Sequence, residues 1–342
     1  MLPLRCRLRK YRLRLAIQWH HGCGATLISS MSLWSAKRRQ IAGWAAVSIS
    51  TLVACFWAFW GSNENFHEGW FSPSVWQNIG LMFAQYLSPM LIVMLISILA
   101  LAWPRLALPL FGASAVAVAW FFRGSHAAIT LIVILLLTLG MLYHFGRPEP
   151  RRWVWRCLIG LPLITMVVCG AYPGWLATHR LDDGNYGMRL IAGNGVTLIW
   201  APEGPGWPSR GVSWHEANRT CVYLGSDGRT VADAPQNIWR LPTVDEAVRS
   251  LVFRGGNAGG NWDPVLRRAR YRTTPDKDSP LWKVHSQVIY WWTGTEIDRD
   301  QAYYITNNGY VHSFPKRVAP GDLAFRCVCE PKRNLLPVRP DP

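Results

Sequence analysis

Five apolar runs between residues 41 and 176 constrain the fold of this 342-residue chain more than any other feature. A helix needs about 20 apolar residues to cross the hydrocarbon core of a bilayer. The runs that approach this length are Ile41–Trp60, Ile79–Trp103, Arg105–Phe122, Ala127–Phe145 and Trp153–Tyr172. Proline and arginine crowd the start of the third run, so a re-entrant segment is the alternative there. We therefore predict a membrane region of five transmembrane helices.

The charges around these runs predict their orientation. Residues 1–40 contain nine lysines or arginines and no acid, whereas residues 61–78 contain two glutamates and no lysine or arginine. The connection at residues 146–152 is again basic, with three arginines and one glutamate. Loops rich in lysine and arginine stay on the cytoplasmic side. We expect a multi-pass protein of the bacterial inner (cytoplasmic) membrane, with a cytoplasmic N-terminus and an extracytoplasmic C-terminal domain.

The formal net charge of +16 belongs mostly to the membrane half. Residues 177–342 contain 21 lysines and arginines against 17 acids, a difference of +4, which leaves +12 for the first half. A strongly basic chain often binds nucleic acid, but the basic excess of this chain follows the expected membrane topology. The predicted partner is therefore the lipid bilayer, and nucleic acid is not expected.

Composition divides the chain into five segments: a basic cytoplasmic segment (1–40), the membrane region (41–176), a linker (177–189), an extracytoplasmic domain (190–330) and a C-terminal tail (331–342). The first 30 residues lack the sustained apolar stretch of a signal peptide. Two hypotheses remain for them, a translation start at Met31 and a disordered cytoplasmic arm.

Two helices are predicted in the C-terminal domain. Ser213–Glu216 and Thr243–Glu246 each have the pattern of a capping box, in which a hydroxyl and a carboxylate bind the first free amides of a helix. The first helix is expected to end near Leu224 and the second near Val252, because glycines follow both positions.

Short β-prone runs surround these helices. Residues 188–200 predict a hairpin around a Gly-Asn-Gly turn, and residues 302–314 predict another around an Asn-Gly turn. Further strands are expected at 288–293 and 323–328, whereas residues 254–286 have few regular signals. The expected domain is α+β with long loops.

Several of these segments resemble two related bacterial families with a C-type-lectin-like fold. The resemblance to the formylglycine-generating, sulfatase-modifying-factor superfamily rests on Val212–Trp214, Ala217–Cys221, Arg240–Thr243 with Glu246, and Arg254–Gly256. The resemblance to the lectin-like domain that ends a bacterial collagen-like adhesin rests on Trp239–Thr243, Tyr290, Trp292–Thr293 and Arg326–Val328. Both cover residues 190–330 and exclude the membrane half.

In both families these motifs are mainly architectural. The resemblance implies that a set of residues forms helix entries and caps rather than a catalytic centre: Ser213, Glu216, Trp239, Arg240, Leu241, Pro242, Thr243 and Glu246. The expected fold class is a multi-span α-helical membrane region followed by an α+β C-type-lectin-like domain with long loops.

Three cysteines lie in the C-terminal domain: Cys221, Cys327 and Cys329. Lectin-like domains join the first helix to the last strand, so the resemblance implies a Cys221–Cys327 disulfide. Cys329 is the alternative partner, because it shares a strand face with Cys327, and an extracytoplasmic compartment permits either bond. The formylglycine-generating enzymes bind copper through a Cys-x4-Cys pair, and this chain departs from that spacing. We therefore expect no catalytic residue, no copper cofactor and loss of the oxidase chemistry.

Two further groups are candidate ligand sites. Asn261 and Asp263 offer oxygen atoms that could bind calcium, with a plain glycine-rich loop as the alternative. Adjacent aromatic residues occur on two expected strands: Trp291, Trp292, Tyr303 and Tyr304. One set must face the core, and the other could stack on a sugar or pack against a partner.

Three functions from different classes fit these features. The favoured one is a membrane-anchored, extracytoplasmic recognition domain that is non-catalytic and binds a glycan, a peptide or an envelope protein. The alternatives are a divergent formylglycine-generating-type oxidase acting on exported proteins, and a structural subunit of a membrane complex. The predicted spans contain no acid–base pair that would mark a transport path, which argues against a transporter.

Overall fold

The computed structural model describes the backbone of residues 5–122 and 126–331, and the side chains within that part except for residues 5–34, 126 and 128. The hypotheses about the first 30 residues and about the tail lie largely outside these descriptions, and they stay predictions.

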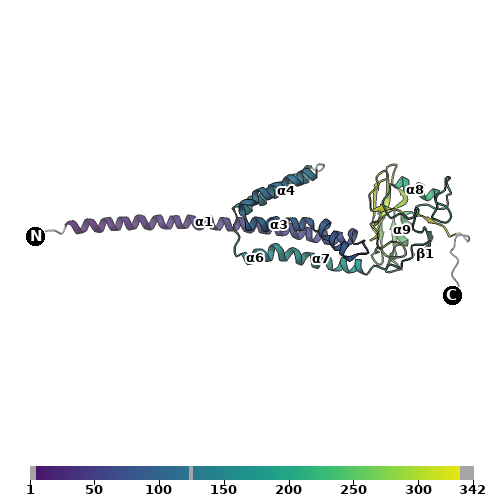
Figure 1. Cartoon of the computed structure of the whole chain (residues 1–342), viewed down its shortest axis with the longest axis horizontal. Helices are drawn as coiled ribbons and strands as arrows, with labels where there is room; N and C mark the ends of the chain where they lie inside the picture. Colours follow the sequence, from purple (N-terminus) through teal and green to yellow (C-terminus); the bar gives the residue numbers. More distant parts are fainter. Residues whose placement is uncertain (1–4, 123–125, 332–342) are drawn as a thin grey trace. The chain divides into compact units, whose positions relative to one another are not determined.

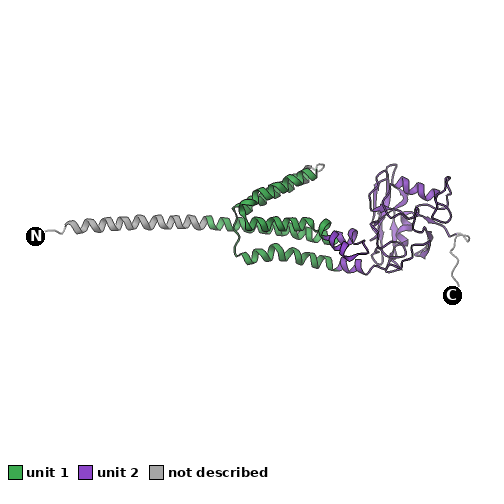
Figure 2. Ribbon diagram, viewed as in Figure 1, with its two compact units in different colours: residues 1–63, 83–171 green, residues 64–82, 172–342 purple. Residues whose placement is uncertain are grey.

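The chain forms two compact units, which Figure 2 shows in different colours. The helical unit comprises residues 1–63 and 83–171, and the C-terminal unit comprises residues 64–82 and 172–342. This division differs from the expected domain boundary in one place. The segment that follows the first apolar run groups with the C-terminal domain instead of with the other helices.

The first half of the chain is built from helices (Figure 1): α1 (Arg5–Glu64), α3 (Ser88–Ala102), α4 (Ala107–Phe121), α5 (His126–Phe145), α6 (Arg151–Trp155) and α7 (Leu161–Thr178). From α3 onward the connections between them are short. A 3-10 turn at Pro104–Leu106 leads into α4, and a π-helical turn at Arg156–Gly160 joins α6 to α7. Between α1 and α3 lie a π-helical turn (Asn65–Gly69), α2 (Val75–Leu81) and a second π-helical turn (Met82–Tyr86).

Three helical segments among the described residues are long and apolar enough to cross a membrane: Ser35–Gly69, Pro104–Phe121 and Arg151–Thr178. A fourth is added if the bent pair Val75–Tyr86 and Ser88–Ala102 counts as one span. The remaining run forms a shorter apolar helix at Ile129–Phe145. Three to four of the five expected runs therefore reach spanning length.

The second predicted run is broken rather than continuous. The π-helical turn ends at Tyr86, and α3 begins at Ser88 with Pro89 in its first turn. Proline is tolerated at the first positions of a helix but removes a hydrogen bond in the interior. The run from Ile79 to Trp103 therefore forms two helical pieces.

The core of the helical unit is built from small and aromatic side chains: Ala46, Val47, Ala100, Ala107, Phe111, Leu139, Tyr143 and Val154. The rings of Phe111 and Tyr143 stack with their centroids 5.7 Å apart. The Tyr143 hydroxyl donates a hydrogen bond to Ser50 Oγ at 3.1 Å, which satisfies this buried polar group.

Two sheets organise the C-terminal unit. The first is antiparallel and has the order β1 (Arg189–Gly193), β2 (Val196–Trp200) and β11 (Val328–Cys329). The second has the order β10 (Leu323–Ala324), β7 (Tyr290–Glu296), β8 (Gln301–Thr306) and β9 (Val311–Pro315), with only the β10–β7 pair parallel. Two short antiparallel pairs join β3 (Val252–Phe253) to β4 (Gly256–Asn257) and β5 (Asn261–Asp263) to β6 (Arg268–Arg270).

Both predicted hairpins are present. Strand β1 pairs with β2 across Asn194 and Gly195, whose φ angles are 52° and 79°. A two-residue turn with positive φ at both positions matches the right-handed twist of the strands that it joins. Strand β8 pairs with β9, and Gly309 in their connection has a φ of 87°.

Two strand predictions need correction. The single strand expected at residues 323–328 is split, because β10 pairs with β7 and β11 pairs with β2 in the other sheet. The stretch 254–286 is not wholly irregular, since it contains the short strands β4, β5 and β6. Partners far away in the chain decide the split, and local propensity does not report them. By contrast, β4 pairs with nearby β3 and β5 with nearby β6, and these strands of two or three residues are too short to give an alternating pattern in the sequence.

Two hydrophobic cores lie on opposite faces of these sheets. Along β7, Trp291 belongs to the first core and Trp292 to the second; along β2, Leu198 belongs to the first and Ile199 to the second. Helix α9 (Val244–Ser250) packs into the first core and α8 (Trp214–Tyr223) into the second. Figure 1 shows α8 and α9 among the strands of this unit. The C-terminal unit is therefore rich in strands, and its C-type-lectin-like fold stays a prediction.

Candidate functional site

The Arg240–Thr243 motif forms the entry to α9. The Thr243 hydroxyl accepts from the Glu246 backbone N–H at 3.2 Å, and the Glu246 carboxylate accepts from the Thr243 N–H at 2.7 Å. Ser213 is the matching cap of α8, and its hydroxyl accepts from the Glu216 N–H at 3.3 Å. Both predicted helix starts are confirmed, and both motifs have an architectural role. The reciprocal capping box is complete only at Thr243–Glu246, because the Glu216 carboxylate makes no bond to the Ser213 N–H.

Arg240 strengthens this cap. Its guanidinium donates to both carboxylate oxygens of Glu246, at 2.6 and 2.7 Å, and to Glu330 at 2.8 Å. Burial raises the pKa of Glu246, but the hydrogen bonds from Arg240 and from the Thr243 N–H outweigh burial and hold that pKa below its ordinary value. A two-point arginine–carboxylate contact adds geometric specificity as well as energy. The motif thus ties the start of α9 to the chain beyond β11.

Cys221 of α8 is joined to Cys327 by a disulfide, which closes a loop with a sequence separation of 106. The sequence left Cys327 and Cys329 as alternative partners, and the structure selects Cys327. Cys329 is buried in the same core, on the same face as Cys327, as expected for residues two apart in extended chain. The Cys327 sulfur is therefore bonded to carbon and sulfur and is not a free thiolate for a metal.

Arg326 is a structural residue that the sequence indicated only as part of a resemblance. It is 0% exposed; its Nε donates to the Ala201 carbonyl at 2.8 Å, and its Nη1 donates to the carbonyls of Pro280 and Leu281 at 2.9 Å each. Its guanidinium lies 3.6 Å from the ring centroid of Trp207. Burial lowers the pKa of Arg326 well below its ordinary value. This single side chain holds the loop after β2 against the loop at residues 280–281.

The four aromatic candidates do not form one exposed surface. Trp291 and Trp292 are 1% and 0% exposed, because both faces of β7 are covered by a hydrophobic core. Tyr303 and Tyr304 are partly buried and pack against the first and second cores respectively. The tryptophans therefore have no free face for a sugar, and stacking on a ligand could involve only the two tyrosines.

The calcium candidates lie in the β5–β6 hairpin. Asp263 Oδ1 accepts from the N–H groups of Val265 and Leu266, at 3.0 and 2.9 Å, so this carboxylate stabilises the turn. Asn261 is exposed at the start of β5. No group of three or more His, Cys, Asp or Glu side chains that could hold a metal ion occurs among the described residues. Calcium binding by Asn261 and Asp263 stays a prediction.

A pocket of about 690 Å³ lies within the C-terminal unit. Its lining comes from three separate stretches of sequence: Phe71, Ser72, Pro73, Gln77, Gly80 and Leu81 from the segment around α2; Glu203 and Ser209 from the loop after β2; and Lys283, His285, Ser286 and Gln287 from the loop before β7. We refer to it as the α2 pocket. The sequence does not predict this pocket, because none of the three stretches contains a recognisable motif.

Hydrogen bonds within the segment and just before it hold the wall at residues 71–81 in place. Buried Asn78 accepts from the Ser72 N–H at 2.9 Å and donates to the Ser72 carbonyl at 2.8 Å, which closes the loop before α2. Just before this loop, the Tyr290 hydroxyl of β7 donates to Glu68 at 3.1 Å. The wall is therefore anchored to the sheet that supports the opposite side.

The opposite wall contains an ion pair between Lys283 Nζ and Glu203 Oε1, at 2.6 Å. The Lys283 ammonium also lies 5.1 Å from the centroid of Trp207, the ring that stacks on Arg326. Lys277 does not line the pocket, but its buried amino group donates to the carbonyl of Ser286, which does. Hydroxyl, amide, imidazole and charged groups thus converge beside the apolar surface of Phe71. Such a lining suits a polar ligand of moderate size.

Lys277→Met is expected to change how the stability of the C-terminal unit depends on pH. Burial, assisted by the charge of Arg180 and opposed by Asp276, lowers the pKa of Lys277 from 10.5 to about 7. Between these two pKa values the unfolded chain keeps the Lys277 proton and the folded chain loses it. The free energy of unfolding therefore rises with pH across this window. Below pH 7 the folded chain must bury the charged ammonium, so the full cost of that burial is present there. Thermal melts followed by tryptophan fluorescence should show a melting temperature that rises between pH 7 and 10.5 for the wild type and does not rise in this way for the Met variant.

The exposed Lys37→Met substitution is the matched control, and its melting profile should follow that of the wild type. Parallel profiles for the wild type and Lys277→Met would show that Lys277 is not held in a neutral state by the fold.

Comparison of this chain with family models, with curated proteins and with solved structures finds no match. The resemblance to the formylglycine-generating superfamily and to lectin-like domains therefore rests on the sequence motifs alone.

Proposed function

We propose that this protein is a membrane-anchored, extracytoplasmic recognition protein whose C-terminal unit binds a glycan, a peptide or an envelope protein without catalysing a reaction. The observation that supports it best is the α2 pocket, which is large enough for a few sugar or amino-acid residues and presents polar groups beside an apolar wall. Sugars and peptides combine hydrogen-bonding groups with apolar faces, so they match such a lining.

Contacts within the C-terminal unit support the extracytoplasmic side. Residues 64–82 follow the first apolar helix and pack in the same unit as residues 172–342. One contact is the hydrogen bond from Arg180 Nη2 to the Phe66 carbonyl at 3.2 Å. A basic N-terminus inside places the first loop outside, and whatever shares a compact unit with that loop lies on the same side. The Cys221–Cys327 disulfide is also typical of an oxidising compartment.

Filling the α2 pocket is expected to abolish ligand binding. Ser209 is exposed and lines the pocket, so Ser209→Trp places an indole in the space that a ligand would occupy. The full-length wild-type chain, in detergent micelles, should retain glycans or envelope peptides in array and pull-down screens. The Trp variant should lose at least tenfold in affinity, which corresponds to about 1.4 kcal/mol.

The control is Ser226→Trp, which adds the same side chain at an exposed serine outside the pocket lining. It should bind like the wild type. Equal binding by all three proteins would place recognition elsewhere. Oxygen consumption by the copper-loaded chain, dependent on Cys329, would contradict the non-catalytic proposal and favour the oxidase.

A further inference from the structure

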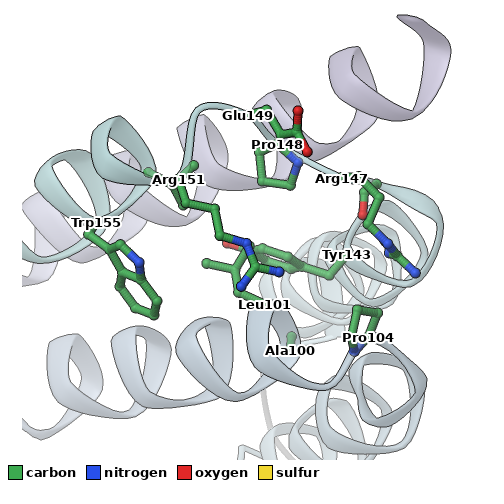
Figure 3. Close-up of a pocket in the computed structure, with 11 residues that line it drawn as sticks. Ala100, Leu101, Pro104, Tyr143, Arg147, Pro148, Glu149, Arg151 and Trp155 are labelled. Carbon is green, nitrogen blue, oxygen red and sulfur yellow. The ribbon is translucent and has the colours of Figure 1, made fainter. Parts of the chain in front are cut away.

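An arginine-lined pocket lies in the helical unit, and it shares no lining residue with the α2 pocket. Figure 3 shows its lining, which includes Leu101, Tyr143, Arg147 and Arg151. The enclosed space is about 50 Å³. A second and more open pocket of about 600 Å³ adjoins it, because Pro104 and Arg147 line both.

Three guanidinium groups surround this double pocket. Arg151 extends from α6 toward Leu101 and Tyr143 in Figure 3, and Arg105 lines the open pocket. Neither forms an ion pair or donates a hydrogen bond within the described part of the chain. Arg147 donates through Nη1 to the carbonyls of Gly146 and His144, at 2.6 and 3.2 Å, and its backbone N–H donates to the Arg39 carbonyl at 2.8 Å; no other side-chain atom of Arg147 donates to a described acceptor.

Glu149 also lines the enclosed pocket, and it forms no ion pair with these arginines among the described residues. Its backbone carbonyl accepts from Gln40 and Trp44 of α1, at 3.1 and 2.9 Å. Those bonds fix the loop between α5 and α6. The net charge around the double pocket is positive, and the guanidinium groups of Arg105 and Arg151 have no acceptor among the described residues.

Apolar side chains adjoin the arginines. Trp103 and Leu106 line the open pocket and are 57% and 46% exposed. Tryptophan is enriched where a membrane helix meets the headgroup layer. Guanidinium groups beside exposed indole and leucine therefore offer a phosphate-binding side and a hydrocarbon-binding side within one hollow.

We propose that this arginine pocket, defined by Arg105, Arg147 and Arg151, binds the phosphate group of an anionic phospholipid, with the acyl chains lying over Trp103 and Leu106. The planar guanidinium matches the geometry of phosphate oxygens, and basic pockets between membrane helices suit lipid headgroups. The inference requires that these helices lie in a bilayer, and it is independent of what the C-terminal unit binds. Inorganic phosphate shares the headgroup chemistry, so the test separates the two sources.

The test is native mass spectrometry of the full-length chain in detergent, titrated with phosphatidylglycerol and, separately, with neutral phosphatidylcholine. The wild type should bind phosphatidylglycerol preferentially, and Arg151→Gln should weaken that binding about tenfold. Arg152→Gln is the matched control, since Arg152 is the neighbouring exposed arginine of α6 and lines neither pocket. Arg105→Gln provides a second pocket variant should Arg151→Gln fold poorly.

The outcomes separate cleanly. Preferential phosphatidylglycerol binding that both pocket variants lose, that Arg152→Gln keeps and that excess inorganic phosphate does not displace supports the proposal. Equal binding of the neutral lipid, or equal losses in Arg151→Gln and Arg152→Gln, overturns it. Binding of inorganic phosphate without lipid would assign the pocket to a soluble phosphate and also contradict the lipid proposal.

Discussion

Replacing both Cys221 and Cys327 with alanine is expected to lower the unfolding free energy of the C-terminal unit by about 4–5 kcal/mol. The bond closes a loop with a sequence separation of 106, and a cross-link over such a long loop removes much of the conformational freedom of the unfolded chain. For a unit of this size the thermal midpoint should fall by about 10 °C or more. Thermal unfolding followed by tryptophan fluorescence measures the change.

Two controls isolate the covalent bond from the packing of its sulfur atoms. Cys329→Ala removes a buried sulfur of the same core that is not part of the disulfide. It should lower the unfolding free energy far less than the double substitution does. A reductant should lower the midpoint of the wild type toward that of the double variant and leave the variant unchanged. A stabilising role for the bond would be refuted by either of two results. One is a wild-type midpoint that reductant does not change; the other is a midpoint of Cys329→Ala as low as that of the double variant.

Arg326→Met should destabilise the C-terminal unit by about 3–5 kcal/mol, because the substitution leaves buried polar groups without partners. The carbonyls of Ala201, Pro280 and Leu281 each lose a donor from the guanidinium. The stacking on Trp207 is weakened as well. The opposing gain is that a charge is no longer buried, but three orphaned acceptors at about 1–3 kcal/mol each outweigh it.

The same substitution is expected to weaken ligand binding in the α2 pocket. Glu203 lies two residues after Ala201, and Lys283 lies two residues after Leu281, so Arg326 fixes both pocket loops. Arg229→Met, at an exposed turn position, is the control and should change stability by no more than about 0.5 kcal/mol. If Arg326→Met melts and binds like Arg229→Met, the guanidinium does not hold these loops.

The local features of the C-terminal unit could be predicted from the sequence because their causes are local. Ser213 and Thr243 cap helices through residues three positions further along the chain, and the Asn194–Gly195 turn requires only two residues with positive φ. The split between β10 and β11 could not be predicted, since their partners lie more than 30 residues away in sequence.

The candidate site shows the same limit. Lys283 and Glu203 form the ion pair of the α2 pocket although 80 positions separate them in the numbering. The aromatic residues of β7 were visible in the sequence, but alternation along a strand cannot tell whether the second face meets solvent or another core. In the structure both faces of β7 are buried at Trp291 and Trp292, each against a different hydrophobic core.

The sequence by itself determined that this chain has an apolar helical half and a polar, strand-rich half, because a hydrophobic run of spanning length and a capping box are properties of contiguous residues. Only the tertiary structure decided that Cys327, and not Cys329, bonds to Cys221, and that residues 64–82 belong with the C-terminal unit. Those choices depend on which distant segments pack together. Packing minimises exposed apolar surface and unpaired polar groups over the whole unit, and short windows of sequence do not contain that information.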